Sequence, residues 1–184
     1  YLLFFGRLSV EKGVDTLLRA FDAALPSLPQ NMRLVVVGDG PDAADFKALA
    51  SSLGCASRIE FTGYQTGGAL QAYVERASLA IASSRWRENM PYSIVEAFAA
   101  GTPVIGTNIG GIPELVDEGK TGFICEPGDV SSMAEAISRG TSAFLDQSAY
   151  SMLQRNCRSY VMENCSREKF MSDLVNLYKE SIDG

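Results

Sequence analysis

Two carboxylates that could act on one ligand, Glu88 and Glu96, lie eight residues apart in the sequence. Glu88 is in a polar, irregular stretch, whereas Glu96 falls early in an apolar segment whose helical start is marked by Pro91. A carboxylate on a rigid helix can accept hydrogen bonds from two vicinal ribose hydroxyls, and Glu88 would then meet another part of that ligand. Two carboxylates that flank a sugar could also be the acid and base of a hydrolase. Alternatively, neither carboxylate binds a ligand: Glu96 interacts favourably with the helix dipole in the first helical turns, and Glu88 is exposed to solvent.

A pair of cations precedes the first predicted helix, in the segments Gly6-Arg7-Leu8 and Glu11-Lys12-Gly13. A cation at a helix N-terminus opposes the helix dipole at a cost of about 0.3–1 kcal/mol, so Lys12 is unfavourably placed unless an anion binds there. The Arg7 guanidinium is a planar fork for phosphate oxygens, and Lys12 adds a point charge. The segment therefore predicts a diphosphate clamp. The simpler alternative is two surface cations, with Lys12 paired to Glu11 or Asp15.

A second glycine turn, residues 38–43 (GDGPDA), matches the pattern G-x-G-x-x-A of dinucleotide-binding proteins, and Glu60 follows about twenty residues later. Asp39 would place a carboxylate next to a pyrophosphate, however, and Glu60 lies inside a predicted strand, where a ribose contact needs the strand end. A tight turn in which Pro41 opens the next helix is the alternative.

Strand-like and helix-like segments alternate along the chain, and the strands are continuously apolar. This pattern predicts an α/β fold, a Rossmann-like doubly wound parallel sheet followed by C-terminal helices. Ligands of such sheets bind at the carboxyl ends of the strands, where the residues above would meet. Strands are expected at 2–5, 34–37, 59–62, 79–82, 103–105 and 122–125, and helices at 14–25, 46–53, 70–76, from 91, from 133 behind a Ser131-Ser132 cap, at 148–163, and behind Ser166 with Phe170, Leu174, Leu177 and Tyr178 on one face.

The composition indicates the number of domains and the classes of partner that the protein can bind. The 184 residues are 46% hydrophobic, enough for one globular domain spanning residues 1–184. A net charge of -6 and a pI of about 4.7 argue against nucleic acid or an anionic membrane surface as the main partner. Four cysteines without a C-x-x-C pair, and no histidine, favour a reduced, cytoplasmic protein without a zinc site. No transmembrane segment is predicted, and the start inside a strand suggests a fragment of a longer polypeptide.

The motifs taken together resemble those of a known family. Glu88 to Glu96, the following AFAAGTPVI and then Gly110-Gly111-Ile112-Pro113-Glu114 resemble the E-x7-E region of retaining glycosyltransferases of family 4, of the group 1 type. The opening GRLSVEKG is similar to the family's G-R-L-x-x-E-K-G motif, and Gly38-Asp39-Gly40-Pro41 matches its second turn. These ordered motifs span nearly all of the chain.

The resemblance implies a GT-B enzyme of two Rossmann-like domains, of which this chain is the C-terminal half that binds a nucleoside-diphosphate sugar. An acceptor glycan, lipid or small molecule would bind the N-terminal domain, which is absent from this chain. No metal or other cofactor is implied, and the sequence has no Asp-x-Asp. The implied catalytic residues are Arg7 and Lys12 at the diphosphate and Glu88 at the sugar hydroxyls; the implied binding residues are Gly6, Arg7, Lys12, Ile59 with its neighbours at the base, Met90, Pro91, Tyr92, and Glu96 at the ribose.

One departure from the family leaves the transferred sugar open. Met90-Pro91 stands where many members have Phe-Gly, and because proline has no N–H, backbone donors must come from Met90, Tyr92 or Ser93. We expect the chain alone to bind nucleotide weakly and to transfer nothing. Two alternatives are a nucleotide-sugar-binding module without catalysis and a nucleotide-sugar epimerase of the same architecture. The full-length protein is expected in the cytoplasm, with the inner face of a membrane as a further possible place.

Overall fold

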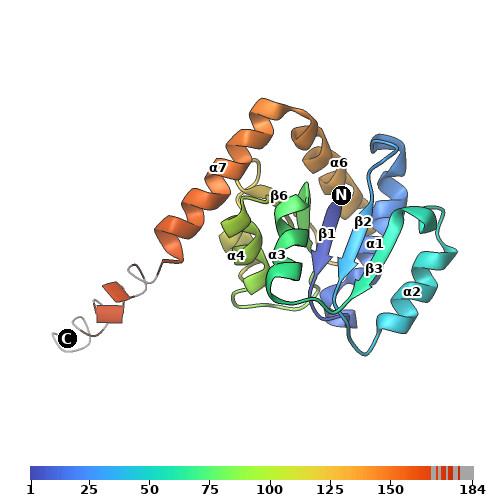
Figure 1. Ribbon diagram of the computed structural model, residues 1–184, viewed down its shortest axis with the longest axis horizontal. Coiled ribbons are helices and arrows are strands. Elements are labelled where there is room, and N and C mark those ends of the chain that lie inside the picture. Colours follow the sequence, from blue (N-terminus) through green and yellow to red (C-terminus); the bar gives the residue numbers. More distant parts are fainter. Residues whose placement is uncertain (167–168, 170, 173, 176–177, 179–184) are drawn as a thin grey trace.

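A computed structural model of the chain describes residues 1–166, 169, 171–172, 174–175 and 178. Its centre is a six-stranded sheet in the order β3-β2-β1-β4-β5-β6, in which all paired strands are parallel. The doubly wound parallel sheet predicted from the sequence is therefore confirmed (Figure 1). The strands are β1 (Leu2–Phe5), β2 (Leu34–Val37), β3 (Ile59–Gly63), β4 (Leu79–Ala82), β5 (Val104–Thr107) and β6 (Gly122–Cys125).

Helices cover both faces of the sheet, because successive side chains of a strand point to opposite faces. In β1, Leu2 and Phe4 join one buried cluster, whereas Leu3 and Phe5 join the other. The helices that pack on the first cluster are α1 (Val14–Ala24), α2 (Ala43–Ser52) and α6 (Val130–Leu145). Those that pack on the second are α3 (Gly67–Arg76), α4 (Tyr92–Ala100), the single turn α5 (Ile112–Leu115) and α7 (Gln147–Asn164), which runs past α4 toward the C-terminus (Figure 1).

The strand order changes direction between β1 and β4, the two central strands. In open parallel sheets such a switch point leaves a crevice outside the carboxyl ends of the two strands, and ligands bind there. β1 leads into Gly6 and the short 3-10 helix η1 (Val10–Lys12), and β4 leads into the loop that carries Glu88. The topology thus brings both predicted motifs to one end of the sheet.

Two helix caps differ from the prediction, and α2 and α3 each begin three residues earlier than expected, at Ala43 and Gly67. Pro91 is extended and precedes α4 as its N-cap instead of occupying the first helical position. The Ser131-Ser132 cap expected for α6 is wrong: the Asp129 carboxylate accepts from the N–H of Ser132 at 3.0 Å, so both serines lie in the first helical turn. Asp129 is the better cap because its backbone is extended there and its side chain accepts from the N–H of Ser132.

The chain's C-terminal part is only partly described. The helix α7 agrees with the prediction to within one residue at each end, and Asp146 caps it through the N–H groups of Ser148 and Ala149. The helix predicted behind Ser166 includes Phe170 and Leu177, which lie outside the described residues. Among the residues that are described, no helix is long and apolar enough to cross a membrane.

Candidate functional site

Two adjoining hollows lie at the carboxyl end of the sheet and share Phe5, Gly6 and Ser93 on their walls. The first, of about 440 Å³, includes Glu96 and is called here the Glu96 hollow. The second, of about 270 Å³, includes Lys12 and is called the Lys12 hollow. Gly6 follows β1 and Ser93 lies in the first turn of α4, so the two hollows meet at the topological switch point.

The Glu96 hollow presents charged side chains that the protein itself leaves unpaired. Glu96 is the fifth residue of α4 and is exposed. Neither Glu96 nor the exposed Arg7 has a side-chain hydrogen bond or an ion pair with any described residue. Tyr64, 74% exposed, adds an aromatic side chain from the loop after β3. The hollow therefore offers a carboxylate, a guanidinium and an aromatic ring to a ligand.

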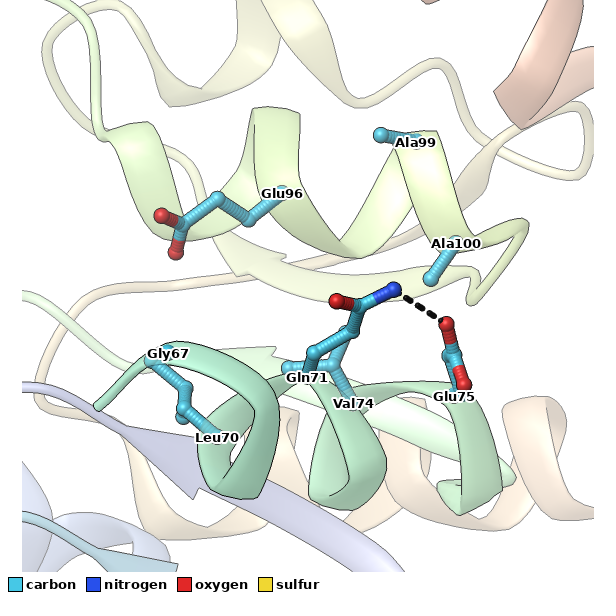
Figure 2. Close-up of a pocket in the computed structure, with 8 residues that line it drawn as sticks. All are labelled: Gly67, Leu70, Gln71, Val74, Glu75, Glu96, Ala99 and Ala100. Carbon is cyan, nitrogen blue, oxygen red and sulfur yellow. Dashed lines mark hydrogen bonds between the residues drawn. The ribbon is translucent and has the colours of Figure 1, made fainter. Parts of the chain in front are cut away.

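Glu96 also borders a third hollow, a groove of about 420 Å³ between α3 and α4. Figure 2 shows the Glu96 carboxylate directed toward the end of this groove where Gly67 and Leu70 lie. At the far end the Gln71 amide donates to Glu75 at 2.6 Å (Figure 2). Glu96 therefore lines both the Glu96 hollow and the groove between α3 and α4.

The Lys12 hollow, by contrast, contains an internal ion pair. The Nζ of Lys12 lies 2.9 Å from an Oε of Glu88, and the two side chains are 31% and 20% exposed. The structure thus brings together two of the predicted site residues. The simpler alternative, with Lys12 paired to Glu11 or Asp15, is wrong, because Asp15 pairs with Arg85 instead. The pKa of the Glu11 carboxyl lies below its ordinary value, chiefly because its own backbone N–H donates to it, and the charges of Arg7 and Lys12 add to the effect.

The N-terminus of α4 forms another wall of the Lys12 hollow. Met90, Pro91, Tyr92 and Ser93 all line it. Pro91 gives no side-chain cap, and the N–H of Ile94 donates to the Pro91 carbonyl at 3.0 Å. The N–H groups of Tyr92 and Ser93 are left without a partner among the described residues. Free N–H groups and the positive end of the helix dipole make such a terminus a suitable place for an anion.

The two glycines at 110 and 111 hold the loop that carries Glu88. The N–H of Gly111 donates to the carbonyl of Glu88 at 2.7 Å. A Cβ at Gly111 would lie 2.0 Å from the carbonyl oxygen of Asn89, and one at Gly110 would lie 2.6 Å from that of Glu88. Only glycines allow the two backbones to approach so closely. The sequence signalled a Gly-Gly turn but not its partner, because the contact crosses from one loop to another.

Ile59, where the sequence predicts a contact with the base, lines neither hollow. It opens β3 and pairs with Leu34, whereas the carboxyl end of the strand is at Gly63. Four residues at about 3.3 Å each separate Ile59 from that end by about 13 Å. The loop that does reach the Glu96 hollow is Tyr64–Thr66. An exposed aromatic just past a predicted strand end was the signal that could have identified it.

The glycines of residues 38–43 serve packing between loops. A Cβ at Gly38 would lie 1.9 Å from the carbonyl oxygen of Gly6, and one at Gly40 would lie 2.3 Å from that of Leu8. Glu60 pairs with Arg33 at 3.3 Å near the amino end of β3. Glu60 is thus not at the strand end that a ribose contact needs, and the turn is tight, but α2 begins at Ala43 behind Asp42 and not at Pro41.

The cysteines offer no reactive thiol at the site. All four are unpaired, and burial raises the pKa of Cys55, Cys125 and Cys157 to about 12 in each case. Such thiols stay protonated at neutral pH and are poor nucleophiles. Across the part of the chain that the structure describes, no three or more His, Cys, Asp or Glu side chains gather into a metal-binding group.

The amino-acid sequence is similar to a known family and to characterised relatives. Residues 1–158 match the family described as "Glycosyl transferases group 1". The D-inositol 3-phosphate glycosyltransferase of Actinosynnema mirum is 37% identical over 147 residues, which cover 75% of this chain and 35% of that protein. The N-acetyl-alpha-D-glucosaminyl L-malate synthase of Bacillus anthracis is 29% identical over 167 residues, which cover 91% of this chain and 42% of that protein.

Solved structures share the fold. HepE of Anabaena, crystallised in complex with UDP, superposes with a TM-score of 0.83 at 23% identity, over 97% of this chain and 48% of that one. Sucrose-phosphate synthase of Thermosynechococcus elongatus superposes with a TM-score of 0.80 at 27% identity, over 99% of this chain and 45% of that one. The chain thus spans less than half the length of each of these proteins.

Proposed function

Because the chain belongs to the group 1 family of glycosyl transferases, we propose that it is the donor-binding half of a retaining, family 4 enzyme of GT-B architecture. The enzyme moves a sugar from a nucleoside-diphosphate sugar to an acceptor. One observation carries the proposal: two hollows adjoin at the switch point, one with the unpaired Glu96 and the other with the Lys12–Glu88 pair. The complex of the similar HepE with UDP-glucose supports this class of donor.

The nucleoside end of the donor belongs in the Glu96 hollow. The two oxygens of the Glu96 carboxylate accept from the two ribose hydroxyls, and the rigid helix α4 fixes their position. Tyr64 lines the same hollow and offers its ring to the base. Because Tyr64 can stack on any base, the choice among uracil, guanine and adenine depends on the polar groups beside it.

The diphosphate and the sugar belong in the Lys12 hollow. When the bond between the anomeric carbon and the diphosphate oxygen breaks, the electron pair stays with the departing nucleotide, whose negative charge increases. Lys12 and the N-terminus of α4 line this hollow, and Arg7 lines the adjoining Glu96 hollow. Together they place positive charge where this negative charge develops, which is electrostatic catalysis. We propose that these groups stabilise the leaving nucleotide without a metal.

Glu88 pairs with Lys12 when no donor is bound and with the sugar of the donor when it is bound. Without donor it neutralises Lys12 at 2.9 Å. When the diphosphate draws Lys12 away, the carboxylate becomes free to accept from hydroxyls of the transferred sugar. The Gly110-Gly111 turn holds the Glu88 backbone in place during this exchange. Glu88 therefore positions the sugar and takes no part as a hydrolytic acid or base.

The acceptor, a glycan, a lipid or a small molecule, binds the other half of the enzyme, outside this chain. We propose that the chain alone binds nucleotide and does not transfer, and that the whole protein works in the cytoplasm, where the inner face of a membrane is a further candidate place. Nucleic acid is not proposed as a partner, because the chain is acidic.

Calorimetric titration of the chain with UDP, GDP, ADP and their common sugars tests the proposal. We expect one nucleoside diphosphate to bind more tightly than the others, and binding to weaken in Glu96→Ala. Failure of all three to bind would refute donor binding. Assays of the longer protein distinguish the alternatives: an epimerase consumes the donor without acceptor, and a binding module binds the donor without turnover.

A further inference from the structure

The loop that follows β4 is fastened to the turn that carries Lys12. Ser83 Oγ donates to the carbonyl of Lys12 at 2.7 Å, and Ser84 Oγ donates to that of Glu11 at 3.2 Å. The backbone N–H of Arg85 also donates to the carbonyl of Glu11, at 2.8 Å. The backbones of η1 and of this loop therefore form one unit, and these contacts do not require the Arg85 side chain.

The Arg85 side chain reaches further, to the first turn of α1. Its Nη2 lies 2.6 Å from an Oδ of Asp15 and also donates to the hydroxyl of Thr16. The Arg85 and Asp15 side chains are 34% and 30% exposed, so the pair is only partly open to water. The Nε of Arg85 and the second Oδ of Asp15 are buried and have no partner among the described residues. They are the atoms that a second, parallel hydrogen bond of a guanidinium–carboxylate pair would join.

Asp15 is a competitor for Lys12. It follows Lys12 by three residues, across the left-handed Gly13 that separates η1 from α1, and is the next carboxylate along the chain. Lysine is a flexible point charge that accepts many partners, whereas the arginine fork binds a carboxylate with fixed geometry. An Asp15–Lys12 pair would remove the cation from the Lys12 hollow. In the structure Lys12 pairs with Glu88, and Asp15 pairs with Arg85.

We propose that Arg85 is a positioning residue that holds the Asp15 carboxylate away from Lys12, so that Lys12 stays available to the diphosphate of the donor. The inference rests on the proposed function, since it assigns Lys12 to a diphosphate. It adds a residue that does not touch the donor and acts through another side chain. Arg85 thus sets the charge of the Lys12 hollow, and the serines and backbone contacts set its shape.

The test is a pair of substitutions in which the second reverses the first. Arg85→Gln releases Asp15, and we expect affinity for UDP, GDP or ADP, whichever wild type binds most tightly, to fall about tenfold or more. Affinity for the corresponding nucleoside, which lacks the diphosphate, stays unchanged. In Arg85→Gln/Asp15→Asn the released group carries no charge, so we expect diphosphate affinity to recover to within about threefold of wild type. Calorimetric titration measures each affinity.

The recovery separates charge from structure, because the double variant lacks the Arg85–Asp15 ion pair as completely as Arg85→Gln does. A double variant that binds as weakly as Arg85→Gln would overturn the inference and assign Arg85 a structural role. Unchanged binding in Arg85→Gln would overturn it as well. Arg139→Gln, which removes the exposed pair with Glu118, is the matched control and should bind as wild type. Thermal unfolding confirms that each variant is folded. If wild type binds none of the three diphosphates, the proposed function fails and this inference fails with it.

Discussion

The Lys12 hollow and the Glu96 hollow share a wall but are built on different principles. In the Lys12 hollow the charged groups are paired with one another, and the loops that carry them are fastened by hydrogen bonds and close glycine contacts. In the Glu96 hollow Arg7 and Glu96 are exposed and unpaired among the described residues, and Glu96 depends only on the rigidity of α4. The comparison shows that the helix backbone alone positions Glu96, whereas Glu88, on a loop, is positioned by hydrogen bonds and close contacts with a second loop.

The largest expected difference concerns two glycines near the hollows, Gly13 next to Lys12 and Gly67 in the groove that Glu96 borders. Gly13 and Gly67 both have left-handed backbones, but a Cβ at Gly13 would lie 2.1 Å from the carbonyl oxygen of Ser83, whereas one at Gly67 would meet nothing within 4 Å. Gly67→Ala should lower the free energy of unfolding by about 1–2 kcal/mol, from backbone strain alone. Gly13→Ala should lower it by about 1–3 kcal/mol more, because the clash adds to the strain. Urea denaturation measures both, and equal losses would contradict the contrast.

Removal of Lys12 should have the next largest effect. In Lys12→Ala the diphosphate loses a cation and faces the unpaired Glu88, so we expect nucleoside diphosphate affinity to fall by about 3 kcal/mol. Lys47→Ala, which removes an exposed lysine of α2, is the control and should change nothing. Lys12→Ala/Glu88→Gln should regain part of the loss, since the uncompensated negative charge is gone. A double variant that binds more weakly than Lys12→Ala would contradict the assigned electrostatics; titration calorimetry gives the values.

Glu96→Ala should cost about 2 kcal/mol of affinity, for the nucleoside as well as for the diphosphate, because the ribose contact is common to both. The free energy of unfolding should stay unchanged, since Glu96 is exposed and has no partner among the described residues. Glu135→Ala, at an exposed position of α6, is the matched control. Unchanged nucleoside affinity in Glu96→Ala would show that this carboxylate is only a helix residue.

The smallest effect is expected at Tyr64. Tyr64→Ala should weaken nucleoside binding by about 1 kcal/mol through loss of stacking, and Tyr64→Phe, which keeps the ring, should bind as wild type. Fluorescence or calorimetric titration with the nucleoside separates the two variants. If Tyr64→Phe is as weak as Tyr64→Ala, the hydroxyl and not the ring makes the contact.

Much of this could be predicted from the sequence, because the information is local. Apolar runs such as Leu34–Val37 identify strands that are buried on both faces. Alternation with helices then implies a parallel sheet, and parallel strands carry their ligands at the carboxyl ends. That rule was enough to place Lys12, Glu88 and Glu96 at the same end of the molecule.

Other features could not be predicted, because they depend on contacts between segments far apart in the chain. Ile59 was assigned to the base although it opens its strand, and the residues after Gly63 reach the hollow instead. The partner of Lys12 was sought among its neighbours Glu11 and Asp15, but it is Glu88, on another loop. The cap of α6 was placed two to three residues late, since serine and aspartate are both good caps and only the backbone conformation selects between them.

By itself, then, the sequence determined the layers of the fold, the end of the sheet at which a ligand would bind, and the types of charged groups gathered there. The tertiary structure alone decided which of these charges face one another. Periodicity and turn residues act over a few positions and can be read along the chain. Pairing depends on the sheet order, which brings the loop after β4 next to the turn after β1 and so gives Asp15 to Arg85 and Lys12 to Glu88.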